Sequence, residues 1–231
     1  MTIPVGLRAR VLDAARSTPS PTRRITAVRS VLALILAGAG PLAFYVGLLR
    51  DPAFDGRPPA LIACTAGGIA LGALCAWWIA LGGRGVLGRP RAWLIAAAFV
   101  GPIWVACWKL SLSAASPALM IEVAARPGAR CFALTVLLGL WPLAVTAYFW
   151  RNTDATHPRS LGAALGMAAG AYAGFLVDLW CPVGYVPHVV FGHVLPIVVL
   201  TCAGIVAGRR FLALRSTGQK SRFVGPARAE V

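Results

Sequence analysis

Long apolar stretches separated by short polar ones make up most of the chain, and this pattern predicts helices that cross a membrane. A helix needs about 20 mainly apolar residues to cross a hydrocarbon core of roughly 30 Å. Six segments meet that length, at residues 30–49, 60–82, 91–112, 131–150, 161–180 and 188–208. We therefore expect an all-α, polytopic membrane protein with six transmembrane helices.

The two ends of the chain differ from this apolar middle. Residues 1–29 and 213–231 are rich in arginine and polar residues and contain no stretch long enough to span a bilayer. We expect three parts: a basic cytoplasmic tail at 1–29, a six-helix transmembrane domain at 30–212, and a basic, disordered cytoplasmic tail at 213–231.

Composition supports the membrane class. Apolar residues account for 58% of the chain, charged residues for 13%, and the mean hydropathy is +0.75. About a quarter of the residues of a soluble domain are charged, because its surface must be wetted. The values exclude an ordinary soluble domain, a disordered chain, a collagen and a coiled coil.

The positions of the basic residues predict how the chain is oriented. With six spans, the two tails, the second loop and the fourth loop share one side of the membrane, and they hold most of the 22 lysines and arginines. The basic residues assigned to the opposite side are Arg50, Arg57, Lys109, Arg126 and Arg130. Because basic loops stay in the cytoplasm, this imbalance predicts a multi-pass membrane protein with both termini in the cytoplasm.

The formal net charge of +15 is explained by this orientation and by contact with anionic headgroups. The sequence contains no zinc finger, helix-turn-helix or platform of basic and aromatic residues. We expect the lipid membrane as a partner and no direct binding of nucleic acid; the sequence leaves the oligomeric state open.

A repeat of small residues marks the fifth predicted span. Gly162, Gly166, Gly170 and Gly174 recur every four residues and so share one helix face. Such a face allows close packing of a neighbouring helix in a membrane. One further step of four reaches Asp178, a carboxylate that needs a partner at such a position. Arg130, Lys109 and a histidine of the sixth span are the candidates.

The predicted topology brings several reactive side chains to the same depth on the outer side. Cys181 ends the fifth span, Cys131 begins the fourth, and His188 and His193 open the sixth. The remaining cysteines (Cys64, Cys75, Cys107 and Cys202) are interpreted as small buried apolar residues. Two thiols, two imidazoles and the Asp178 carboxylate are thus expected at one level, whereas their lateral distances are not predicted.

Two chemistries suit this group, and the spacing does not decide between them. Cys131 and Cys181 can form a disulfide in an oxidising periplasm if their Cα atoms lie within about 7 Å. Alternatively, the thiolates and the imidazoles suit a metal such as zinc or cadmium. The chain has no C-x-x-C motif, and we expect no resident cofactor.

The order of these motifs resembles that of the NrsF-type anti-sigma factors, which are six-span inner-membrane proteins. The resemblance rests on Cys131 at the start of the fourth span, on Leu-Trp-Cys-Pro at 179–182, on the histidines of the sixth span, and on Gly-Arg-Arg-Phe-Leu at 208–212. It covers most of the chain and is best from residue 131 to residue 215.

The resemblance implies a regulator that holds an extracytoplasmic-function sigma factor at the membrane and releases it upon a signal. In this family Cys131 and Cys181 would be the sensing pair for oxidative or heavy-metal stress, with Asp178, His188 and His193 as accessory residues. An enzymatic activity is not expected.

A membrane thiol oxidoreductase or a small transporter is the alternative. An oxidoreductase of this size would be expected to carry a close cysteine pair and a quinone pocket, and the absence of a C-x-x-C motif counts against it. A transporter would need a polar site at the midplane, where the predicted spans hold almost no ionisable residue.

Overall fold

The computed structural model is helical throughout the elements it describes. It describes residues 23–48, 90–114, 128–151, 157–181 and 183–213, with nine single positions between 60 and 78. The first four helices are α2 (Arg23–Leu48), α4 (Arg91–Ala114), α5 (Ala129–Phe149) and α6 (Pro158–Trp180). The last apolar rod combines α7 (Val186–Val189), the π-helical η3 (Val190–Val194), α8 (Leu195–Ala207) and the π-helical η4 (Gly208–Leu212).

Five of these helical segments are long and apolar enough to cross a membrane. They are Val28–Val46, Arg91–Ser111, Ala129–Phe149, Pro158–Leu179 and Val186–Leu212. This confirms the all-α class, and five of the six expected spans are helices long and apolar enough to cross a membrane. The second expected span, 60–82, lies largely outside the described residues, as do most of the two tails.

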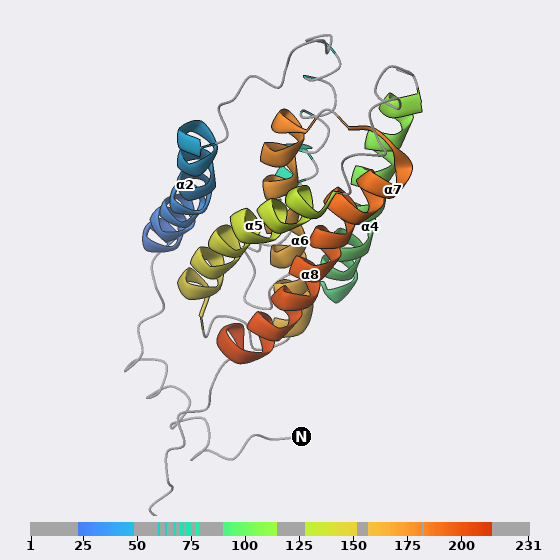
Figure 1. Cartoon of the computed structure of the whole chain (residues 1–231). Helices are drawn as coiled ribbons and strands as arrows, with labels where there is room; N and C mark the ends of the chain where they lie inside the picture. Colours follow the sequence, from blue (N-terminus) through green and yellow to red (C-terminus); the bar gives the residue numbers. More distant parts are fainter. Residues whose placement is uncertain are drawn as a thin grey trace, which may run out of the picture.

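Helix α6 is the centre of the bundle. It contacts α2, α4, α5 and α8, and Figure 1 shows α2 and α4 on opposite flanks with α5, α6 and α8 between them. Ten of its 23 residues are alanine or glycine, and the buried core includes Ala164, Ala168 and Ala171. Small side chains let the neighbouring backbones come close, which is how helices associate when lipid supplies no hydrophobic drive.

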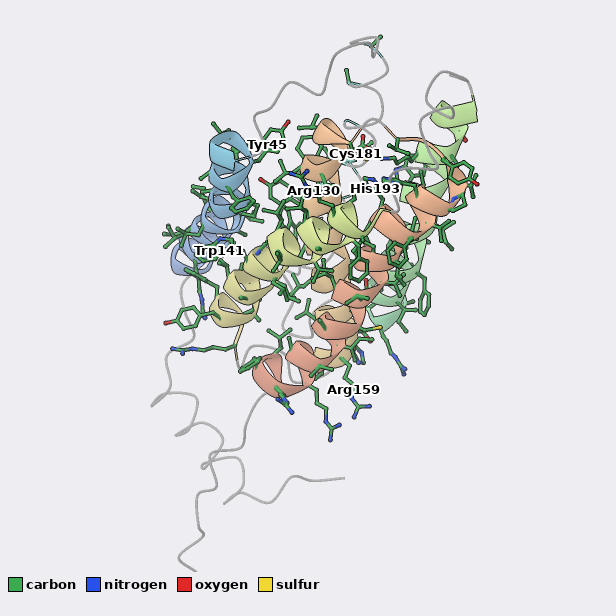
Figure 2. All side chains as sticks on the ribbon, in the orientation of Figure 1. Tyr45, Arg130, Trp141, Arg159, Cys181 and His193 are labelled. Atoms are coloured by element: carbon green, nitrogen blue, oxygen red, sulfur yellow. The ribbon has the colours of Figure 1, made fainter. Side chains whose placement is uncertain are left out.

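The helix directions give the bundle two chemically different ends. We call the end that carries the start of α5 and the end of α6 the thiol end, because Cys131 and Cys181 lie there. The opposite end is called the basic end, and the basic residues described there include Arg91, Arg151, Arg159, Arg209 and Arg210. Figure 2 shows Cys181, His193 and Arg130 toward one end and Arg159 toward the other.

Side-chain hydrogen bonds attach α2 to the rest of the bundle. The Nε1–H of Trp141 donates to the carbonyl of Leu36 at 2.8 Å, and the hydroxyl of Tyr172 donates to the carbonyl of Gly38 at 2.9 Å. Pro41 lies within this helix and removes the N–H that the intervening carbonyl, of Ala37, would otherwise bind. The two bonds therefore anchor α2 where its own hydrogen-bond ladder is interrupted.

Candidate functional site

Four potential metal ligands meet at the thiol end of the bundle. One sulfur or ring nitrogen from each of Cys131, Cys181, His188 and His193 lies within 4.8 Å of the others, and all four residues are buried. The predicted topology gave these residues a common depth but no lateral distance. The structure brings them together from α5, from the end of α6, and from the start of the last rod.

The two cysteines are positioned by helix ends. Cys131 lies in the first turn of α5. Gly128 precedes this helix as its N-cap, and its φ of 75° is a left-handed conformation that favours glycine. Cys181 is the C-cap of α6; its N–H donates to the carbonyl of Val177 at 2.8 Å, and its own backbone turns extended. Each thiol is thus held where a helix begins or ends.

A π-helical turn places the two histidines on one side of the last rod. His188 and His193 are five residues apart, which on a regular α-helix would direct them to different faces. In η3 the N–H of Leu195 donates to the carbonyl of Val190, five residues back, so the turn is wider. The rings consequently lie with their centroids 5.6 Å apart.

The thiols and the imidazoles contact each other directly. The sulfur of Cys181 lies 3.1 Å from Nε2 of His188, and both cysteines are free thiols in this structure. Cys181 follows the membrane-spanning part of α6. The hydrogen bond with Cys131 is the main cause that lowers the pKa of the Cys181 thiol well below its usual value; the histidines act in the same direction, and burial opposes them.

A buried ion pair adjoins this cluster. Lys109 of α4 pairs with Asp178 of α6, and the side chains of both are almost fully buried. The Nζ of Lys109 also lies 3.3 Å from Nε2 of His193. Lys109 is one of the three partners that the sequence left open for Asp178, whereas Arg130 is exposed on α5.

Lys109 has a larger role here than the sequence analysis gave it. The count of basic residues assigned it to the outer side, and the structure places its side chain inside the bundle, 4% exposed. The signal was present in the sequence, because Lys109 is an isolated charge in an apolar span. An ionisable residue within a span generally faces the bundle interior and a partner.

Two of the cysteines interpreted as buried are exposed. Cys107 of α4 and Cys202 of α8 lie on the outside of the bundle, so that prediction was wrong for both. A thiol is compatible with either setting, because lipid is as apolar as a protein core. Cys64 and Cys75 lie outside the described residues.

The glycine stripe of α6 faces the last rod. A Cβ added at Gly162 would overlap the carbonyl oxygen of Gly204, and one at Gly166 would overlap that of Leu200. At Gly170 it would lie 3.0 Å from the Cα of Ile197, and at Gly174 it would meet only ordinary contacts. The backbones of the two helices therefore touch most closely toward the basic end.

The opposing glycines were not singled out from the sequence. A Cβ at Gly204 would overlap the carbonyl oxygen of Gly162, and one at Gly208 would overlap that of Pro158. The spacing of four between Gly204 and Gly208 repeats the signal of the fifth span. Glycines of α6 and glycines of the last rod thus face each other, and each set leaves room for the backbone of the other helix.

These features define a multi-pass helical membrane protein with a buried cluster of thiols and imidazoles at one end. The family model described as "NrsF: Negative regulator of sigma F" matches residues 11–213, and the chain belongs to this family. The family description names a negative regulator of a sigma factor. No curated protein and no solved structure matches the chain.

Proposed function

We propose that this protein is a membrane-embedded anti-sigma factor that retains an extracytoplasmic-function sigma factor and releases it when Cys131 and Cys181 sense oxidative or heavy-metal stress. The observation that carries the proposal is the cluster of these two buried thiols with His188 and His193, all within 4.8 Å. Thiols this close can form a disulfide or bind a soft cation after a small movement.

The proposed orientation has the thiol end in the periplasm and both termini in the cytoplasm. Described arginines at or next to helix ends of the basic end include Arg91, Arg151, Arg159, Arg209 and Arg210. Among the described residues of the thiol end, the basic side chains are Lys109, which is paired with Asp178, and the exposed Arg130. This distribution supports the basic end as the cytoplasmic one, by the positive-inside rule.

This orientation predicts opposite accessibility of two exposed arginines, Arg130 and Arg159. A cysteine introduced by Arg130→Cys is expected to react with a membrane-impermeant maleimide in intact spheroplasts. The Arg159→Cys variant is expected to gain label only after lysis. Labelling is read against the wild-type chain, and the reverse pattern would refute the orientation.

The last rod and α6 provide a route from the thiols to the cytoplasm. Cys181 is the C-cap of α6, and both histidines lie on the rod that packs against α6. Because the two helices touch through backbone atoms at Gly162 and Gly204, a movement of one at the thiol end is passed to the other. A bistable helix pair biased by thiol chemistry is the simplest such switch.

The sigma factor would bind at the basic end. Exposed arginines at Arg151, Arg159, Arg209 and Arg210 present positive charge there. Complementary charge favours encounter and register between two proteins, so an acidic surface of the sigma factor is the expected counterpart.

The sensing role is tested by removing both thiols. In membranes treated with diamide or cadmium, the wild-type chain is expected to lose its co-purifying sigma factor, and a sigma-dependent reporter is expected to switch on. The double variant Cys131→Ser/Cys181→Ser is expected to retain the sigma factor and keep the reporter silent under the same treatment.

The matched control is Cys107→Ser/Cys202→Ser, which removes two thiols from the exposed surface of the bundle. It is expected to respond as the wild type does. An unchanged reporter response in the Cys131→Ser/Cys181→Ser variant would show that these thiols are not the sensor.

A further inference from the structure

We infer that Cys131, Cys181, His188 and His193 form a four-ligand, tetrahedral binding site for one divalent cation of the zinc or cadmium class. The inference deepens the proposed function by naming the ligand set and the cation; it rests on that function only for the consequence of binding, namely release. Two sulfurs and two imidazole nitrogens are a donor set that zinc adopts in closed structural sites.

The geometry needs little change to accept the ion. Ligand atoms about 2.0–2.3 Å from a tetrahedral ion are separated from each other by roughly 3.3–3.8 Å. The four donor atoms here are within 4.8 Å of one another, and the sulfur of Cys181 is already 3.1 Å from a ring nitrogen of His188. A small inward movement of the donors therefore completes the site.

The charges favour a divalent ion. Two thiolates with two neutral imidazoles carry two negative charges, which a divalent cation cancels. The neighbouring Lys109–Asp178 pair is itself neutral. The exchange balances without a redox step: the ion enters, two thiol protons leave, and no electron is transferred. A monovalent ion would leave a net negative charge buried in the bundle, which is costly.

His193 provides an observation that points to a ligand. It is 1% exposed, and its Nδ1 has no hydrogen-bond partner among the described residues. A buried polar atom of this kind is rare and calls for a partner, such as an ion. The other ring nitrogen of His193, Nε2, lies 3.3 Å from the Nζ of Lys109.

Binding is tested with the reduced, full-length protein in detergent, using cobalt and cadmium as probes. Titration with Co²⁺ is expected to give the intense visible bands of tetrahedral coordination together with thiolate charge-transfer bands, saturating at one ion per chain. Excess Cd²⁺ is expected to displace the cobalt and remove these bands. A weak, octahedral-type cobalt spectrum from the folded wild-type protein would overturn the inference.

Variants identify the ligands. Cys131→Ser, Cys181→Ser, His188→Asn and His193→Asn are each expected to weaken binding by at least the roughly 10–100-fold that loss of an outer-shell partner costs. Cys107→Ser and Cys202→Ser, which alter exposed thiols, are expected to leave the affinity unchanged. Wild-type affinity in folded His188→Asn and His193→Asn variants would overturn the four-ligand site.

The inference and the proposed function fail separately. Tight tetrahedral binding in purified protein that leaves the sigma factor attached to membranes would support the site and contradict the proposed function. Release by diamide in a chain that binds no ion would overturn the site and leave thiol sensing in place.

Discussion

Replacing either member of the Lys109–Asp178 pair is expected to destabilise the protein by about 3–5 kcal/mol, because each single change leaves the other charge buried without its counter-ion. Both side chains are almost fully excluded from solvent, 4% and 1% exposed. Asp178→Val and Lys109→Met remove the charge while retaining apolar bulk. Reversible unfolding in mixed detergent micelles measures the loss.

The double variant Lys109→Met/Asp178→Val distinguishes the interaction between the two side chains from the contacts that each makes with other residues. Apolar residues of similar size often replace a buried ion pair with little net loss of stability. We therefore expect the double variant to be more stable than either single variant, with a strongly non-additive double-mutant cycle. Additive losses would show that each side chain acts through other contacts. This test concerns stability and does not depend on the sensing role.

Hydropathy predicted the helices well because membrane spans are set by one strong constraint. Every backbone polar group in lipid must be bonded within its own segment, so an apolar run of sufficient length has to be helical. The five described spans follow that rule. The helix ends were less well predicted: α2 begins at Arg23 and the last rod runs to Leu212, beyond the apolar runs themselves. Helical hydrogen bonding continues into polar residues, which hydropathy does not register.

The lateral assembly of the site could not be predicted from periodicity. On an α-helix with 3.6 residues per turn, His188 and His193 would lie on different faces. The π-helical turn of η3 brings both to the same side of the last rod. Pro196 follows that turn and lacks the N–H that an α-helix would use. A proline soon after a glycine–histidine pair was the local signal for an irregular turn.

The pairing of buried charged side chains was also not fixed by the sequence alone. The sequence placed Lys109 among three candidate partners of Asp178 but could not choose between them, because the two residues lie on helices far apart in the chain. Asp178 is buried, and it lies one step of four beyond the glycines from which its direction was predicted. A periodic marker on the same helix predicts where a side chain points; a partner on another helix requires the fold.

A side chain at Gly204 is expected to separate α6 from the last rod and to release the sigma factor without stress. A Cβ there would overlap the carbonyl oxygen of Gly162 and would lie 2.9 Å from the Cα of Gly166. Because these are backbone atoms, they cannot move aside as a flexible side chain would. Overpacking of this kind costs about 1–3 kcal/mol, and we expect Gly204→Ala to lie at the upper end and Gly204→Leu beyond it.

Gly174→Ala is the matched control, since it lies on the same stripe of α6 but its Cβ would be 3.7 Å from the nearest atom, in Ile197. It is expected to keep wild-type stability or gain slightly, because alanine favours a helix over glycine. Thermal unfolding in detergent measures the loss of stability. The uninduced level of a sigma-dependent reporter measures release of the sigma factor without stress. Suppose that Gly204→Leu unfolded at the wild-type temperature and kept the reporter silent. Close packing of α6 against the last rod would then not be what holds the regulator in the state that retains the sigma factor. A destabilised but silent variant would instead separate packing from signalling, since the contact would then support the fold without transmitting the state of the thiols.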